Sequence, residues 1–186
     1  NTASPVICKP LAHGAAIVMH SLTKYIGGHG TSIGGIVVDG GNFDWTKNRK
    51  RQPLLNEPDQ SYGGAVWIDA VPQLTGANIP FVIRLRVVLL RDTGAPLAPF
   101  NAWQIIQGLE TVGLRMKQHC SNAEKVVTFL ETQKKVQNVI YPTNHQGEIK
   151  ERALKYMKGG YGSLVGMDVG TKENGAKFID NLKMLY

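Results

Sequence analysis

The sequence predicts an α/β protein, and three features of the 186-residue chain support this. Two short apolar runs, residues 15–20 and 35–38, are each followed by turn-forming residues rich in glycine, as strands often are. A long stretch from Asn101 repeats apolar residues at helical spacing. Beyond it, strand-like and helix-like segments alternate, which is typical of α/β units.

The first apolar run, 15–20, is of the kind buried in parallel sheets, and it is followed directly by residues 21–24 and a cluster of glycines. The second run, 35–38, is expected to be another buried strand that ends at the turn 39–42. Both predictions rest on continuous apolar runs, because strands covered on both faces lack the alternation of half-exposed ones.

Residues 52–64 contain several prolines and glycines and are predicted to form a loop. Residues 65–92 are predicted to be largely helical. Pro72 and Pro80 are expected at the ends of this helical segment or at a kink, because proline cannot donate a hydrogen bond inside a helix.

The clearest predicted element is one long helix, or two end to end, that reaches about Thr132. Asn101 is expected to cap it, with Gln104 as the reciprocal partner three positions on. Gly108 and Gly113 each cost about 1 kcal/mol relative to alanine, so we expect another element to pack closely against both. The apolar stripe comprises Trp103, Ile106, Leu109, Val112, Leu114, Met116, Cys120, Ala123, Val127 and Leu130.

The last third of the chain alternates between the two kinds of element. The expected order is a strand at 136–141, a basic helix at 150–158, a strand at 161–169 and an amphipathic helix at 173–185. This alternation suggests the opening of a second α/β unit, with the long helix bridging the two.

Composition narrows the class of protein. Hydrophobic residues make up 42% and charged residues 19%, which excludes an intrinsically disordered chain. No run of about 20 apolar residues is present, so we expect no membrane partner. Cys8 and Cys120 are too few for a disulfide framework or a cysteine metal cluster, and they favour a reducing, cytoplasmic compartment.

The net charge of +7 raises the alternative of a basic module that binds nucleic acid. Much of the excess lies in residues 47–51 and 150–158. No zinc-finger spacing, helix-turn-helix pattern or aromatic-flanked RNA motif accompanies either run. Solvated basic faces are therefore favoured and no nucleic-acid partner is expected, while the role of residues 47–51 stays open.

Lys24 is the main candidate for chemistry. It follows a predicted strand, and open α/β sheets bind ligands at the carboxyl ends of their strands. A desolvated lysine there can form an imine with a carbonyl group, while Ser21, Thr23 and free glycine amides can bind a phosphate. Pyridoxal 5'-phosphate (PLP) needs both functions. The Ser-x-Thr-Lys spacing alone is a weak signal and by itself favours an ordinary surface lysine.

Three other interpretations fit less well. Ser21 and Lys24 also form the Ser-x-x-Lys of penicillin-recognising hydrolases, but neither Ser-Asp-Asn nor Lys-Thr-Gly is present. The glycines fail the dinucleotide fingerprint, since Ile33 stands at its third glycine position. The three histidines at positions 13, 20 and 29 share no strand or helix face, so no metal site is expected.

The residue order of several segments is informative in itself. Residues 20–30, His-Ser-Leu-Thr-Lys-Tyr-Ile-Gly-Gly-His-Gly, closely resemble the lysine segment of the Cys/Met-metabolism family of PLP-dependent enzymes. The opening Asn-Thr-Ala-Ser-Pro, residues 1–5, resembles another motif of that family. Further segments resemble the members that act as O-acetylhomoserine sulfhydrylases, namely residues 34–39, 43–45, 57–62, 90–92, 98–101 and 107–111.

The resemblance implies a fold-type I, aminotransferase-like architecture and a homotetramer built from active dimers. Lys24 matches the lysine that forms an imine with PLP, and Ser21 and Thr23 match the hydroxyls that bind its phosphate. The implied reaction replaces the acetate of O-acetyl-L-homoserine with sulfide and gives L-homocysteine, in methionine biosynthesis. Cystathionine γ-synthase, O-succinylhomoserine sulfhydrylase and the γ-lyases of the same family are the alternatives.

The resemblance also implies a place within a longer enzyme. Residues 1–120 would be the end of the large PLP-binding domain together with most of the linking helix, and 121–186 would begin the small C-terminal domain. Several residues that complete such a site are expected outside the chain. The 186-residue polypeptide alone is therefore expected to lack sulfhydrylase activity.

Overall fold

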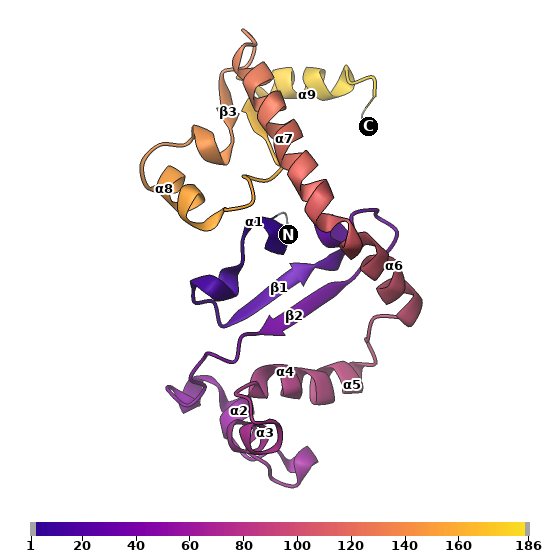
Figure 1. Cartoon of the computed structure of the whole chain (residues 1–186), viewed down its shortest axis with the longest axis vertical. Coiled ribbons are helices and arrows are strands. Elements are labelled where there is room, and N and C mark those ends of the chain that lie inside the picture. The colour runs from indigo at the N-terminus through magenta and orange to yellow at the C-terminus, as the bar shows by residue number, and fades with distance from the viewer. Residues whose placement is uncertain (1–2, 185–186) are drawn as a thin grey trace. The chain divides into compact units, whose positions relative to one another are not determined.

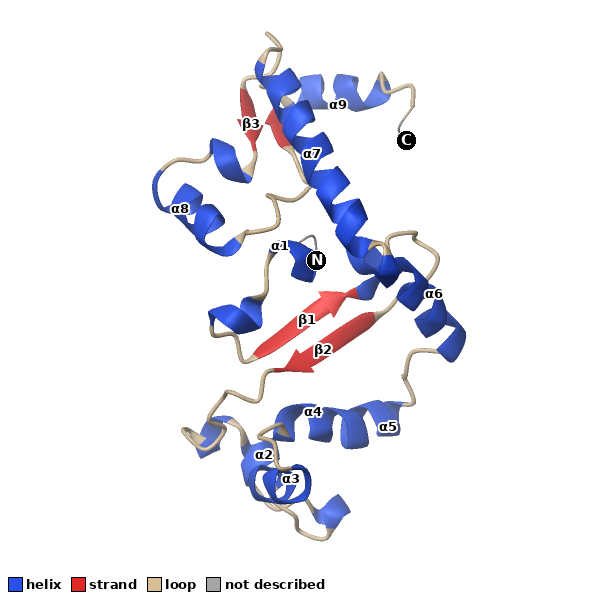
Figure 2. Ribbon diagram, in the orientation of Figure 1, coloured by secondary structure: helices blue, strands red, loops and turns tan. Residues whose placement is uncertain are grey.

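The computed structural model describes residues 3–184, a mixture of helices and short strands (Figure 2). The chain divides into two compact units, Lys9–Leu109 and the combination of Asn1–Cys8 with Glu110–Tyr186. Each is described by itself (Figure 1). This division comes from contacts within the chain, and the domain assignment at residue 120 stays a prediction.

The unit Lys9–Leu109 begins with a 3-10 turn, Pro10–His13, and the hairpin of β1 (Ile17–Ser21) and β2 (Gly35–Asp39). The two predicted strands are confirmed, but the expected buried, parallel arrangement is wrong. The strands pair antiparallel, with Met19 opposite Val37, and the Met19 side chain is 73% exposed. The connection, residues 22–34, contains the tight turn Leu22–Ile26 and no α-helix, whereas a helix usually forms the crossover between neighbouring parallel strands.

Short helices follow the hairpin in the same unit. They are the 3-10 turns Arg49–Arg51 and Gln60–Tyr62 and the helices α2 (Pro53–Asn56), α3 (Trp67–Thr75), α4 (Pro80–Arg84), the π-helical Leu85–Leu90 and α5 (Arg91–Thr93). The helical prediction for 65–92 is confirmed, whereas the predicted loop 52–64 contains α2. Pro80 begins α4 as expected, but Pro72 lies inside α3.

The hydrophobic core of this unit is formed by side chains from the loop after the hairpin and from helices α2 and α3. Its buried residues are Trp45, Leu55, Trp67, Ile68 and Val71. No single helix in residues 3–184 is long and apolar enough to cross a membrane. Within the same residues, the helices Trp67–Thr75 and Pro80–Thr93 are long and apolar enough when taken together, but they are bent by 99° relative to each other.

The long helical stretch consists of α6 (Pro99–Glu110) and α7 (Val112–Glu131), interrupted at Thr111. Two helices end to end were one of the two predicted forms. The expected cap at Asn101 is wrong, because α6 already begins at Pro99, whose fixed φ suits the first turn of a helix.

The apolar stripe is only partly buried. On α7, Met116, Cys120, Ala123 and Val127 are buried, as the spacing predicts. Other members of the stripe are about half or more exposed, namely Trp103, Ile106, Leu109 and Leu114. Periodicity identifies an apolar face, but it does not show which part of that face is covered within one chain.

The other unit contains α1 (Ser4–Ile7), α7, β3 (Asn138–Ile140), α8 (Gly147–Tyr156), β4 (Gly166–Asp168) and α9 (Lys172–Asp180). The predicted alternation is confirmed, with shorter strands than expected, and the two strands pair antiparallel. Asn1 and Thr2 of the N-terminal motif, and Leu185 at the predicted end of the last helix, lie outside the described residues.

Tyr141 is the largest fully buried side chain among the described residues of this unit, with 1% of its surface exposed. It packs with Ala123 and Val127 of α7 and with Val139 of β3. Its hydroxyl donates a hydrogen bond of 2.9 Å to the carbonyl oxygen of Gly162. Burial, reinforced by nearby acidic groups, raises the pKa of Tyr141 to about 12.

Tyr141→Phe should lower the stability of this unit by about 1–3 kcal/mol, because the Gly162 carbonyl loses its donor. In the wild type, the raised pKa makes stability fall as the pH increases from about 10 to about 12, by about 2–3 kcal/mol. Denaturant unfolding at several alkaline pH values measures both effects. An unchanged alkaline pH dependence in Tyr141→Phe would contradict the assignment to this residue.

Candidate functional site

The chain leaves β1 through a tight turn that carries Lys24. Leu22–Ile26 forms one π-helical turn, and Lys24 interrupts it with φ −79° and ψ −125°. The Gly27 amide donates to the Leu22 carbonyl oxygen at 2.8 Å, and the Gly28 amide donates to the Lys24 carbonyl oxygen at 2.8 Å. We call residues 22–28 the lysine turn. Its position just beyond the carboxyl end of β1 is the predicted one.

The side chain of Lys24 is exposed, so its expected burial is wrong within this chain. The reason is local, since the residues that follow include Gly27, Gly28 and Gly30, which have no side chains to cover it. Among the described residues, Lys24 forms no ion pair.

Thr23 fixes the lysine turn to the start of β2. Its hydroxyl oxygen accepts a 2.9 Å hydrogen bond from the Gly34 amide, and the Leu22 amide donates to the Gly34 carbonyl oxygen at 2.9 Å. The Thr23 hydroxyl donates to that same carbonyl oxygen only at 3.3 Å. The hydroxyl proton is therefore held weakly and remains available to a ligand oxygen.

Ser21 is the last residue of β1 and lies opposite Gly35 in the strand pairing. Its side chain is half-buried, and within the described part of the chain its hydroxyl has no hydrogen-bond partner. No α-helix begins at Ser21, although the penicillin-hydrolase interpretation needs one there. The structure thus brings together Ser21, Thr23 and Lys24 at the end of one strand.

Helix α6 supports the glycine-rich segment after Lys24. A methyl group on Gly108 would overlap the carbonyl oxygen of Gly27 and lie 2.7 Å from its carbon, so only glycine allows this approach. The close packing predicted for Gly108 is confirmed. The same prediction is wrong for Gly113, where a methyl group would meet no atom within 4 Å.

A second contact of α6 could not be predicted from local spacing. The buried Ser32 hydroxyl donates a 2.7 Å hydrogen bond to Oε1 of Gln104. The spacing of residues predicts instead that Gln104 caps its own helix. No local pattern could reveal the pair, because 72 positions separate the two residues.

The residues of this site fit the aldehyde and the phosphate group of PLP. An exposed amine can take the aldehyde, and two neighbouring hydroxyls with available protons can bind phosphate oxygens.

His29 turns its Nδ1 toward the Gly27 carbonyl oxygen at 2.7 Å. Among residues 3–184, no three histidine, cysteine, aspartate or glutamate side chains are grouped so as to hold a metal ion.

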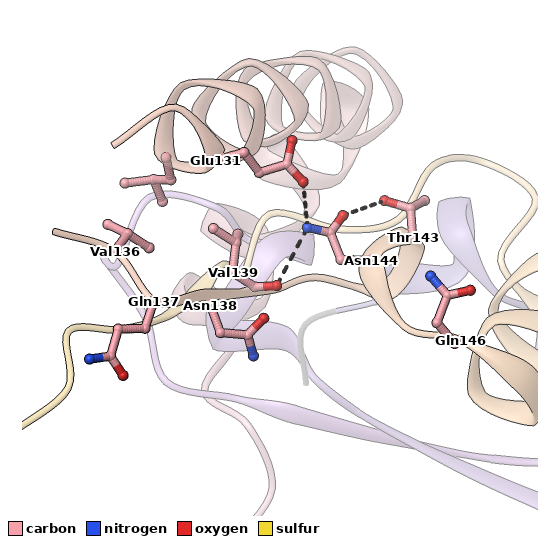
Figure 3. Close-up of a pocket in the computed structure, with 9 residues that line it drawn as sticks. Glu131, Val136, Gln137, Asn138, Val139, Thr143, Asn144 and Gln146 are labelled. Atoms are coloured by element: carbon pink, nitrogen blue, oxygen red, sulfur yellow. Dashed lines mark hydrogen bonds between the residues drawn. The ribbon is translucent and has the colours of Figure 1, made fainter. Parts of the chain in front are cut away.

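A separate pocket of about 450 Å³ lies in the other unit, between α7 and β3 (Figure 3). Asn144 lies at its centre and donates to Oε1 of Glu131 at 2.8 Å, while Thr143 donates to Oδ1 of Asn144 at 3.4 Å. The side-chain amides of Gln137, Asn138 and Gln146 also line this pocket.

The whole chain is similar in sequence to a known protein family. The model of the family described as Cys/Met metabolism PLP-dependent enzyme matches residues 1–186. The chain belongs to this family. Among curated members of the Cys/Met metabolism family, O-acetyl-L-homoserine sulfhydrylase of Leptospira meyeri is 45% identical over 186 residues, which cover 97% of this chain and 42% of the relative. Homocysteine synthase of Schizosaccharomyces pombe is 41% identical over 179 residues, covering 96% and 41%.

Solved structures of the family agree. A Campylobacter jejuni protein described as an O-acetylhomoserine (thiol)-lyase, whose structure contains a pyridoxyl-lysine phosphate, matches 100% of this chain and 45% of its own. The TM-score is 0.85 and the identity 34%. Cystathionine γ-lyase of Lactobacillus plantarum matches 98% of this chain and 38% of its own, with a TM-score of 0.68 and 28% identity.

The expected fold class is therefore confirmed, since the chain has the fold of a segment of fold-type I PLP-dependent enzymes. It spans about two fifths of the length of the curated relatives it matches. The exposures given above for the hairpin strands and for the apolar residues of α6 are those of this 186-residue chain by itself.

Proposed function

We propose that the protein containing this chain exchanges the acetate of O-acetyl-L-homoserine for sulfide and so forms L-homocysteine. The single observation that carries the proposal is the lysine turn, which presents Lys24 beside two hydroxyls at a strand end. The relatives named as sulfhydrylases and homocysteine synthases support the choice of substrate within the family.

In this proposal each residue has a defined task. Lys24 holds the cofactor aldehyde until substrate arrives, and its Nζ then takes the proton from Cα of the amino acid. Ser21 and Thr23 donate their hydroxyl protons to the cofactor phosphate. The cofactor, when bound, supplies an electron sink that stabilises negative charge beside the substrate amino group.

The position of Lys24 suits this double task. It lies on an exposed turn rather than in a covered strand, so its side chain can move between the cofactor and the substrate. The turn itself is held in place by the bonds of Thr23 to Gly34 and by the approach of Gly27 to α6. A fixed backbone with a mobile amine is what a proton shuttle needs.

The remaining expectations are parts of the same proposal. The active form would be a cytoplasmic homotetramer assembled from dimers. Residues 1–120 would complete a large cofactor-binding domain, and 121–186 would begin a small one. Sulfide or a thiol would be the second substrate.

The test is a comparison of substrates on the complete protein that contains this chain. Turnover with sulfide should be fastest for O-acetyl-L-homoserine, at least about tenfold above O-succinyl-L-homoserine, because one acyl group fits its pocket better. Cystathionine without sulfide serves as the control for γ-elimination. Preferred release of an oxo acid from cystathionine would replace the proposal with a γ-lyase, and preference for the succinyl ester would change the acyl group.

A further inference from the structure

The peptide group between Gly27 and Gly28 lies at the end of the lysine turn, and both of its polar atoms are hydrogen-bonded. Its N–H, which belongs to Gly28, donates to the Lys24 carbonyl oxygen at 2.8 Å. Its carbonyl oxygen, which belongs to Gly27, accepts a hydrogen bond from Nδ1 of His29 at 2.7 Å. A single peptide plane therefore connects the His29 ring to the backbone of Lys24.

His29 supplies the only side chain within residues 27–30, because the other three residues are glycines. Gly28 and Gly30 have φ values of 74° and 66°, in the left-handed region that glycine adopts readily. Glycine also loses more conformational freedom on folding than any other residue. A stretch of this kind needs a restraint to keep one shape, and within these four residues only the His29 side chain can provide it.

The hydrogen bond to Gly27 determines where the imidazole of His29 carries its proton. A carbonyl oxygen can only accept, so Nδ1 is protonated in the neutral ring as well as in the charged one. The neutral ring then has its lone pair on Nε2. The distance of 2.7 Å is at the short end of the range for N–H···O bonds. His29 is therefore exposed on the surface but held by a well-formed bond.

Helix α6 approaches the same carbonyl group, within the unit Lys9–Leu109. The position where a Gly108 methyl group would overlap the Gly27 oxygen is occupied by a hydrogen on the Gly108 Cα. A Cα–H group is a weaker donor than a ring N–H. The packing on α6 therefore limits movement toward the helix, whereas the orientation of the peptide plane depends mainly on His29.

The two bonds of this peptide strengthen each other, since hydrogen bonds in a chain polarise the groups between them. Donation from His29 to the Gly27 carbonyl makes the Gly28 N–H a better donor to the Lys24 carbonyl. Loss of the imidazole would weaken the bond that closes the turn on Lys24. It would also let both glycines sample other conformations, so the backbone that carries the lysine side chain would be less well fixed.

We propose that His29 is a positioning residue for Lys24. It orients the Gly27–Gly28 peptide, and this peptide holds the Lys24 carbonyl, so that the lysine side chain extends from a fixed backbone. The inference rests on the function proposed for Lys24, and it adds a residue that acts without touching cofactor or substrate. The alternative is an exposed histidine whose removal changes nothing at the turn.

Three substitutions in the complete protein separate these possibilities. His29→Asn retains a donor, because the asparagine nitrogen is bonded to Cγ as Nδ1 is in histidine. His29→Gln places its nitrogen one bond further away, as Nε2 is, and His29→Ala has no donor. In the cofactor-free protein, amide hydrogen exchange across residues 22–30 should be about five- to tenfold faster in the alanine and glutamine variants. It should stay within about twofold of wild type in His29→Asn.

Affinity for PLP should follow the same order, because a turn that is already ordered binds without the cost of ordering it. We expect about five- to tenfold weaker binding for His29→Ala and His29→Gln, and less than about twofold for His29→Asn. The denaturant midpoint should remain near that of wild type in all three, which separates a local effect from a general loss of stability. His145→Ala, in the other unit, is the matched control and should change neither exchange nor affinity.

A measurement on the wild type keeps the test valid if a variant fails to fold. Nitrogen NMR of isotope-labelled histidine should show Nδ1 of the neutral His29 ring protonated and Nε2 unprotonated. The opposite tautomer, unchanged exchange in His29→Ala, or a His29→Asn variant no closer to wild type than His29→Gln would each overturn the proposal. Exchange and tautomer are measured without cofactor or substrate, so their outcome is separate from the substrate comparison that tests the proposed reaction.

Discussion

Lys24→Ala in the complete protein should abolish the absorbance of the imine between lysine and cofactor, and borohydride should no longer fix the cofactor to the chain. Turnover of O-acetyl-L-homoserine with sulfide should fall by at least about 10³-fold, because the variant loses both the covalent anchor and the group that moves protons. Absorbance spectra, peptide mass after reduction and steady-state rates measure these three effects.

Lys125→Ala is the matched control. Lys125 is also exposed, but it lies on α7 in the other unit, so the spectrum and the rate should both remain at wild-type values. A wild-type imine absorbance in Lys24→Ala would show that another amine binds the cofactor. Loss of activity with an unchanged spectrum would instead restrict Lys24 to proton transfer.

Gly108→Ala should be the most damaging small substitution in the fold. The new methyl group would overlap the Gly27 carbonyl oxygen, and backbone atoms cannot move aside as a flexible side chain can. We expect a loss of about 3 kcal/mol in the free energy of unfolding, at the upper end of what overpacking costs. Because the displaced backbone belongs to the lysine turn, affinity for PLP should also fall. Denaturant unfolding and fluorescence titration with PLP measure the two effects.

Gly113→Ala provides the comparison, since it makes the same chemical change where a methyl group meets no atom within 4 Å. It should leave PLP affinity unchanged and stabilise the helix by about 0.5–1 kcal/mol. Equal stabilities for the two alanine variants would mean that Gly27 and Gly108 do not approach as closely as described.

Local patterns were sufficient for most elements of this fold. The strands around 15–20 and 35–38 and the helices on either side of Thr111 follow from the spacing of apolar residues, because that spacing reflects the local backbone geometry of each element. The position of Lys24 after a strand could be predicted for the same reason. The resemblance of residues 20–30 to a family motif then supplied the chemistry that spacing alone left open.

Features that depend on distant neighbours could not be predicted in this way. The antiparallel pairing of β1 and β2, the bond between Ser32 and Gln104, and the different surroundings of Gly108 and Gly113 all involve segments brought together only by folding. The burial of Arg84 in α4, whose side chain is 14% exposed, belongs to the same group, since a charged residue in an apolar helical run gives no sign of what lies opposite it. Helical spacing likewise overestimated how much of α6 is covered.

The dependence of the lysine turn on α6 has a consequence for biosynthesis. Gly27 packs on Gly108, and Ser32 bonds to Gln104, 72 positions later in the chain. At roughly 5–20 residues per second, a ribosome needs several seconds to add that stretch. The nascent turn therefore remains without its support for that time, and under the proposed function it reaches the geometry that would hold the cofactor only after α6 has been made.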